Sequence, residues 1–302
     1  MNKKQFSLFQ LILSMIIFGT IGIFRRSLPV SSSFLAMYRG FAGSLFLSIC
    51  LCAGKRKSDW HKVKRKIIPL LITGAMIGMN WILLFESYRY TTVAVSTLCY
   101  YMSPVFVMIA SPLILRQKLE RRKVICVVLS LIGMVLITGV FSSSSTVGQS
   151  KLTGVLLGLG AAVLYAVVIL MNQTLSDVPS LERTILQLFS AGAAVLPYTL
   201  LTDGTAGFQA IPQHWKLFLL VGLVHTGIAY ILYFSSMDGL SAQTVAVISY
   251  LDPFTAILLS ALFLHEPMDL PGVVGTALIL SAAIYSEIPL SFRRKREQDS
   301  TC

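Results

Sequence analysis

Apolar residues come in ten runs of about twenty, and a helix of that length crosses the roughly 30 Å hydrocarbon core of a bilayer. Only 13% of the residues are charged, about half the share of a soluble globule, and the mean hydropathy is +0.75. The first run is too long for a cleaved signal core of roughly 7–15 residues. We therefore predict an all-α integral membrane protein with ten transmembrane helices, near residues 6–24, 34–53, 67–87, 93–115, 124–141, 152–171, 184–202, 216–236, 243–264 and 270–288.

The basic residues predict which way these helices cross the membrane. Loops taken alternately from the N-terminus place 19 of the 25 Lys and Arg residues on one side and five on the other, while Arg39 falls inside a helix. Because cytoplasmic loops carry the excess of positive charge, we expect both termini to be cytoplasmic in a multi-pass protein of the cell (plasma or inner) membrane. We expect the basic loops to face anionic lipid, so the net charge of +12 requires no nucleic-acid partner.

The two halves of the chain are related at an offset of 149 residues. The segment from Phe85 to Pro104 aligns with the segment from Phe234 to Pro253, and the first five apolar runs correspond to the last five. Because five is odd, the second half enters the membrane inverted relative to the first, an architecture common in secondary transporters. We expect two inverted-topology repeats of five helices, 1–145 and 146–302, the second with a basic cytoplasmic tail.

Each repeat carries a proline about midway along a predicted helix, Pro104 in the fourth and Pro253 in the ninth. Proline lacks an amide hydrogen, so the carbonyls of Tyr100 and Ser249 are expected to lose their helical partners. Such carbonyls are tolerated at membrane depth only where protein or a water-filled cavity satisfies them. The matched pair favours broken helices that line a site near the bilayer midplane. Two tolerated kinks are the alternative.

Few ionisable residues fall within the predicted helices, where each costs roughly 2.5–3.5 kcal/mol on insertion scales. Asp252 precedes Pro253 and is a candidate for binding an ammonium group or a coupling proton, or else for a structural contact. Glu86 is a candidate vestibule carboxylate, although Arg89 at i+3 offers it a surface ion pair. Arg39 requires a partner such as Asp252 or Glu86, or else a carboxylate-bearing substrate.

The remaining candidates are polar or aromatic residues within the helices. His225 is expected to be a hydrogen-bonded packing residue, with a proton relay or substrate contact as the alternative. Aromatic pockets with few polar groups suit small organic ligands, although a single ring is more often a packing residue. On this ground the candidate list closes with Asn80, Trp81, Tyr101 and Tyr250.

Short segments in corresponding places of the two halves carry a resemblance to a known family. They read Tyr-Thr-Thr-Val-Ala at 90–94, Ser-Pro-Val-Phe at 103–106, Gly-Ile-Ala-Tyr at 227–230, Leu-Asp-Pro at 251–253 and Leu-His-Glu-Pro-Met at 264–268. Together with ten helices in two matching registers, they resemble the EamA type of the drug/metabolite transporter superfamily. The resemblance covers nearly the whole chain and implies transport of small metabolites, often amino acids or related compounds.

These observations predict a secondary transporter, with no cofactor and no metal site, that moves a small metabolite by alternating access, with efflux favoured. Protons are a candidate coupling ion, the substrate and the lipid bilayer are the expected partners, and the oligomeric state stays open. The alternatives are a polytopic membrane enzyme acting on lipid and a non-transporting receptor or assembly partner. The four histidines are scattered and no Asp-x-x-Asp or His-x4-Asp constellation accompanies them, which disfavours the enzyme.

Overall fold

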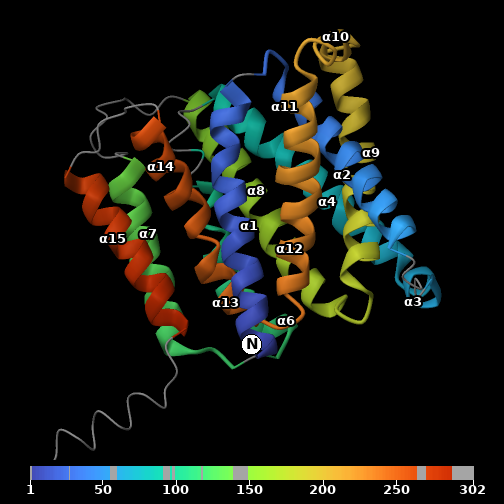
Figure 1. Ribbon diagram of the computed structural model, residues 1–302. Helices are drawn as coiled ribbons and strands as arrows, with labels where there is room; N and C mark the ends of the chain where they lie inside the picture. The colour runs from blue at the N-terminus through green and yellow to red at the C-terminus, as the bar shows by residue number, and fades with distance from the viewer. Residues whose placement is uncertain are drawn as a thin grey trace, which may run out of the picture.

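The computed structural model describes residues 2–26, 28–54, 60–90, 96, 99–116, 118–138, 149–263 and 270–287. Every regular element within these ranges is a helix, and the helices form a bundle with α10 at one end and the N-terminus at the other (Figure 1). The helices of the first half are α1 (Lys3–Arg26), α2 (Ser32–Ala53), α3 (Trp60–Arg65), α4 (Ile67–Tyr90), α6 (Ser103–Ile114) and α7 (Arg121–Thr138).

The second half repeats this order with more interruptions. Its elements are α8 (Gln149–Thr174), α9 (Ser180–Thr202), α10 (Ala206–Gln209), α11 (Trp215–Leu219), the π-helix η2 (Leu220–Ile228), α12 (Ala229–Ser236), α13 (Ala242–Ile248), α14 (Leu251–Phe263) and α15 (Leu270–Glu287).

The predicted all-helical membrane fold is confirmed. Among the described residues, six helical segments are long and apolar enough to cross a bilayer, and α6 and α15 are shorter apolar helices. The fourth and ninth predicted spans are broken, and the eighth contains a π-helix where a regular helix was expected. Parts of four predicted spans lie outside the described residues, at 93–95, 97–98, 139–141, 264 and 288.

Helix packing follows the inverted repeat. Corresponding helices of the two halves pack on each other in two pairs, α2 on α9 and α7 on α15, and the fourth span meets the ninth where α6 packs on α13. The pair formed by α7 and α15 lies along one edge of the bundle (Figure 1). The other large contacts come in matched sets, since α4 packs on α8 as α12 packs on α1, and α6 packs on α8 as α14 packs on α1. The two halves are therefore arranged as repeats related by a pseudo-twofold axis.

Glycines allow the central helices to approach closely. A Cβ added to Gly40 in α2 would lie 2.6 Å from the backbone nitrogen of Gly192 in α9, and one added to Gly74 in α4 would collide with the carbonyl oxygen of Gln187 in α9. Small residues at such crossings replace the hydrophobic driving force that is weak between helices in lipid. The α2–α9 and α4–α9 crossings are therefore intolerant of larger side chains.

Two basic residues that were assigned to lipid-facing loops are buried, so for them that prediction is wrong. Lys123 is 5% exposed, and its Nζ donates to Ser241 Oγ at 3.1 Å and to Thr244 Oγ1 at 2.7 Å while pairing with Glu120 at 3.2 Å. The side chain lies inward because the start of α13 supplies hydroxyl acceptors that the hydropathy of the chain does not reveal.

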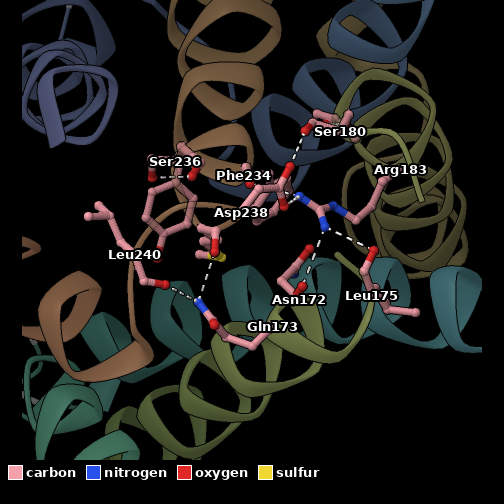
Figure 2. A network of polar contacts seen from close by, with 12 residues as sticks. Asn172, Gln173, Leu175, Ser180, Arg183, Phe234, Ser236, Asp238 and Leu240 are labelled. Carbon is pink, nitrogen blue, oxygen red and sulfur yellow. Dashed lines mark hydrogen bonds and ion pairs between the residues drawn. The ribbon is translucent and has the colours of Figure 1, made fainter. Parts of the chain in front are cut away.

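Arg183 is the second buried cation, and it joins the start of α9 to the end of α12 (Figure 2). Its Nη2 donates to the carbonyl of Phe234 at 2.7 Å and to Asp238 Oδ1 at 2.8 Å, and its Nη1 donates to the carbonyl of Leu175 at 3.0 Å. Gln173 donates to the carbonyls of Met237 and Leu240 from the same side. The 237–240 turn is thereby tied to α8 and α9.

Candidate functional site

Both helix breaks fall where the repeat predicts them, but the prolines lie after the breaks. Turns at residues 101–102 and 249–250 interrupt the fourth and ninth spans, and Pro104 and Pro253 lie in the first turns of α6 and α14. A proline in the first turn removes no helical hydrogen bond. The carbonyl of Ser249, which cannot bond to Pro253 four residues later, accepts instead from the amide of Asp252 at 3.2 Å, so it is not left without a partner.

The two breaks contact each other through polar groups. The hydroxyl of Tyr101 donates to Asp252 Oδ2 at 2.9 Å, and the hydroxyl of Tyr250 donates to the backbone carbonyl of Tyr101 at 2.9 Å. The two tyrosine rings lie 6.1 Å apart. Tyr101 and Tyr250 are buried, whereas Asp252 keeps part of its surface accessible. A carboxylate of the second half is thus held by a tyrosine of the first.

Arg39 of α2 is 8% exposed and forms no ion pair within 4 Å of Asp252 or Glu86. Its Nε donates to Thr226 Oγ1 at 3.0 Å, and its guanidinium carbon lies 5.1 Å from the centroid of Trp81. A guanidinium over an indole face is a favourable cation–π arrangement. The structure therefore gives Arg39 an aromatic and a hydroxyl neighbour in place of the carboxylate partner that the sequence offered.

A row of aromatic side chains runs from the Arg39 guanidinium to the Asp252 carboxylate. Successive ring centroids lie between 5.0 and 6.4 Å apart, and one pair also shares a hydrogen bond of 2.7 Å between two hydroxyls. The rings come from α1, α4, α8, the first break and α12, so helices from both halves contribute. In order, they are Trp81, Tyr230, Phe18, Tyr233, Tyr165, Tyr100 and Tyr101.

The π-helix η2 carries His225 beside Thr226. His225 Nε2 lies 2.7 Å from Thr20 Oγ1 of α1, and its Nδ1 lies 3.4 Å from the carbonyl oxygen of Leu220. The ring also packs edge-on against Phe24. Such hydrogen bonding matches the packing role favoured by the sequence. π-Helical turns are rare in proteins as a whole, but those that occur are often found at functional sites. This one places two polar residues next to Arg39.

Two of the predicted site residues lie away from this cluster. Glu86 forms the i, i+3 pair with Arg89, Nη1 to Oε2 at 3.1 Å, and accepts a hydrogen bond from Tyr198. These residues line a cavity of about 200 Å³ at the end of α4 that also contains Asp203. Asn80 points elsewhere, since its side-chain amide donates to the carbonyl of Ala161 at 2.6 Å and joins α4 to α8.

Sequence reasoning missed several members of the cluster. Tyr230 was recoverable, because it is the residue 149 positions after Trp81 and contacts it at 6.0 Å. Tyr165 and Phe18 carry no comparable signal, since each lies in a long apolar helix whose facing direction depends on packing. Thr226 was visible only as the neighbour of His225. Among the described residues, no group of three or more His, Cys, Asp or Glu side chains could hold a metal ion.

The helical bundle, its two repeats and the polar cluster between them define a multi-pass membrane transporter. The chain belongs to the EamA-like transporter family, whose sequence model matches residues 5–139 and 152–286. The recognition made from the sequence is therefore confirmed, including its division into two matching stretches.

Similar proteins agree with this assignment. The uncharacterized transporter YxxF of Bacillus subtilis is 29% identical over 93% of this chain and 89% of its own length. The uncharacterized inner membrane transporter YhbE of Escherichia coli is 28% identical over 84% of this chain and 82% of its own length. Protein PecM of Dickeya dadantii is 26% identical over 75% of this chain and 76% of its own length. A solved crystal structure at 17% identity superposes with a TM-score of 0.78 over 95% of this chain and 96% of its own, which shows a shared fold.

Proposed function

We propose that the chain is a secondary transporter that exports an amino acid or a related compound by alternating access, coupled to protons through Asp252. The contact between Tyr101 and Asp252 carries this proposal, because it joins the two repeats at their helix breaks. When repeats rock against each other around a central site, a contact of this kind changes with the facing direction of the transporter. Proton or ligand binding at the carboxylate then depends on that direction.

The surroundings of Asp252 suit either a proton or an ammonium group. Tyr101 supplies one hydrogen bond, and Arg39 interacts electrostatically with the carboxylate without pairing to it. The tyrosine rings beside it offer an apolar wall with hydroxyls at intervals, which matches a small amphipathic ligand. Proton–substrate exchange at one carboxylate is the simplest mechanism in which both ligands compete for the same charge.

The test is exchange in proteoliposomes prepared with purified protein. Vesicles loaded with a defined mixture of amino acids, amines, nucleosides and sugars are placed in acidic buffer, and the external compounds are measured by mass spectrometry. We expect an amino-acid-type compound to leave faster when the outside is more acidic than the lumen, and Asp252→Asn to lose this acceleration. Glu86→Gln is the matched control and retains it.

The competing classes predict different results. A membrane enzyme acting on lipid, or a receptor that does not transport, gives the same leakage as protein-free vesicles for every compound. Exchange that ignores the proton gradient in the unmodified protein would remove proton coupling and leave facilitated diffusion. Faster release under an alkaline exterior would reverse the direction that we propose.

A further inference from the structure

Arg39 uses only part of its hydrogen-bonding capacity. Its Nε donates to Thr226 Oγ1 at 3.0 Å, whereas the described residues give its two Nη atoms no hydrogen-bond partner. Some polar atoms of the protein are completely buried and have no hydrogen-bond partner, such as Arg183 Nε. The two Nη atoms of Arg39 do not belong to this group. The outer edge of this side chain, which is more than nine-tenths buried, is therefore not fully enclosed.

The nearby carboxylates of the described chain are engaged elsewhere. Asp252 accepts from Tyr101, Glu86 is held by Arg89 and Tyr198, and neither lies within ion-pair distance of Arg39. An unpaired cation inside a membrane protein is costly and marks a substrate pathway or a missing partner. Within the described residues, Arg39 thus has no carboxylate at ion-pair distance, and its Nη atoms leave room in the hydrogen-bonding pattern for an anionic group.

The π-helix fixes the orientation of the guanidinium. The hydroxyl of Thr226 donates to the carbonyl of Val221, five residues earlier, at 2.9 Å, which turns its lone pairs toward Arg39 Nε. Trp81 covers one face of the guanidinium at 5.1 Å. With Nε and one face occupied, the edge formed by Nη1 and Nη2 remains, and that edge matches the two oxygens of a carboxylate.

We propose that Arg39 is the carboxylate-binding residue of the transport site and that Thr226 is its positioning residue. The ligand class is a zwitterion with an apolar side chain, whose carboxylate binds the Nη edge and whose ammonium group binds Asp252. The apolar side chain packs against rings of the aromatic row. This inference rests on the proposed transport function and adds the chemistry that selects the substrate.

The test compares acids with their amides, which keep the ammonium group and side chain but lose the carboxylate. Phenylalanine and leucine are paired with phenylalaninamide and leucinamide, and binding to the purified full-length protein is measured by calorimetry. We expect each acid to bind about tenfold or more tightly than its amide, in line with a charged hydrogen-bonded contact.

Three variants locate this preference. Arg39→Lys keeps the charge but loses the planar fork, and we expect it to weaken acid binding about tenfold with amide binding unchanged. Thr226→Val removes the hydroxyl at constant shape and is expected to weaken acid binding about threefold to tenfold, while Thr226→Ser restores it. Thr199→Val is the matched control, because that buried hydroxyl donates only to the carbonyl of Val195 within α9.

The outcomes separate this inference from the transport function. Equal binding of acid and amide by the unmodified protein, or binding of neither, overturns the carboxylate subsite. If Arg39→Lys and Thr226→Val still prefer the acid over its amide, the roles assigned to Arg39 and Thr226 are overturned. If Thr226→Val does not fold, the comparison of Arg39→Lys with Thr226→Ser tests these roles instead. If the vesicles exchange a compound without a carboxylate, the transport function is supported and the carboxylate subsite is refuted. If the vesicles exchange nothing but the purified protein still prefers the acid over the amide, only the transport function is refuted.

Discussion

The two helix breaks share their geometry but differ in chemistry. Each consists of a tyrosine in a turn followed by a proline in the next helical turn, at Tyr101 and Pro104 in one half and Tyr250 and Pro253 in the other. The residue that precedes the proline differs, since Asp252 holds a charge and its counterpart is Ser103. Ser103 is fully buried and its hydroxyl has no partner. The backbone device is therefore duplicated, whereas the charged group occurs once.

The same asymmetry is found around the cation. The position equivalent to Arg39 at the offset of 149 residues is Leu188, a fully buried core residue. By contrast, the aromatic pair survives in both halves as Trp81 and Tyr230, which contact each other. A transporter whose two repeats make the same motion can keep the same hinge in each repeat, while each charged group of the site occurs in only one of them.

The largest difference in exchange rate is expected between variants of Asp252 and of its counterpart Ser103. Asp252→Asn removes the titratable charge at constant size, and we expect proton-driven exchange to fall about a hundredfold, the scale of a lost proton-transfer group. Ser103→Ala removes a hydroxyl without a partner, and we expect exchange within about twofold of the unmodified protein. Vesicle exchange rates measure both, and similar losses for the two variants would show that the breaks are chemically equivalent.

The two tyrosines are expected to fail in different ways. Tyr101→Phe removes the donor to Asp252, and the loss of a hydrogen bond to a charged group should lower ligand affinity about tenfold. Tyr250→Phe removes a donor to a backbone carbonyl, which should cost about 1 kcal/mol of stability and leave affinity unchanged. Calorimetry and thermal unfolding of each variant distinguish these results. An affinity loss in Tyr250→Phe alone would contradict the assignment.

Each break is also packed against a glycine of the opposite half. A Cβ on Gly19 would lie 2.7 Å from the carbonyl oxygen of Asp252, whereas one on Gly158 would meet Cys99 Cβ at 2.9 Å. We expect Gly19→Ala to destabilise the protein by about 1–3 kcal/mol, because overpacking there displaces the backbone of the break. Gly158→Ala should cost about half as much. Thermal unfolding in detergent measures both, and the reverse order would show that the first break is the more rigid one.

The smallest effect is expected far from the breaks, at the start of α2. Burial raises the pKa of Asp203, but hydrogen bonds from Ser31, Ser33 and Thr202 outweigh it and leave the pKa below the usual 3.8. A lowered pKa in the folded state adds stability that is present above 3.8 and disappears as the pH falls through the folded value. Ser33→Ala should therefore lower the unfolding temperature slightly at neutral pH and progressively less below about pH 4. A constant difference across that range would contradict this origin.

The sequence predicted the positions of the helices better than the direction of their side chains or the irregular turns within them. Runs of about twenty apolar residues located the spans, and the matched prolines located both breaks, because each of these signals is local. The inward course of Lys123 and Arg183 was not predictable, since their acceptors at Thr244 and Phe234 are distant in sequence. The π-helix also escaped prediction, because residues 220–228 have the apolar composition of any membrane helix.

At the site, single residues were predictable but their grouping was not. Asp252, Arg39 and Trp81 stood out because charge and indole rings are rare or distinctive within apolar spans. Their contacts depend on how helices from both halves cross, so the partnership of Arg39 with Thr226 could not be read from spacing. Glu86 met the same criteria as Asp252 and nevertheless lies with Tyr198 in a separate cavity.

The buried Arg183 has a consequence for how the chain is assembled during synthesis. Its main acceptors, the carbonyl of Phe234 and the carboxylate of Asp238, follow it by 51 and 55 residues. When Arg183 at the start of α9 reaches the membrane, those acceptors have not yet left the ribosome, so the guanidinium must stay hydrated at the membrane surface. Only the arrival of α12 allows it to move inward, which makes closure of this end of the bundle a late step of biogenesis.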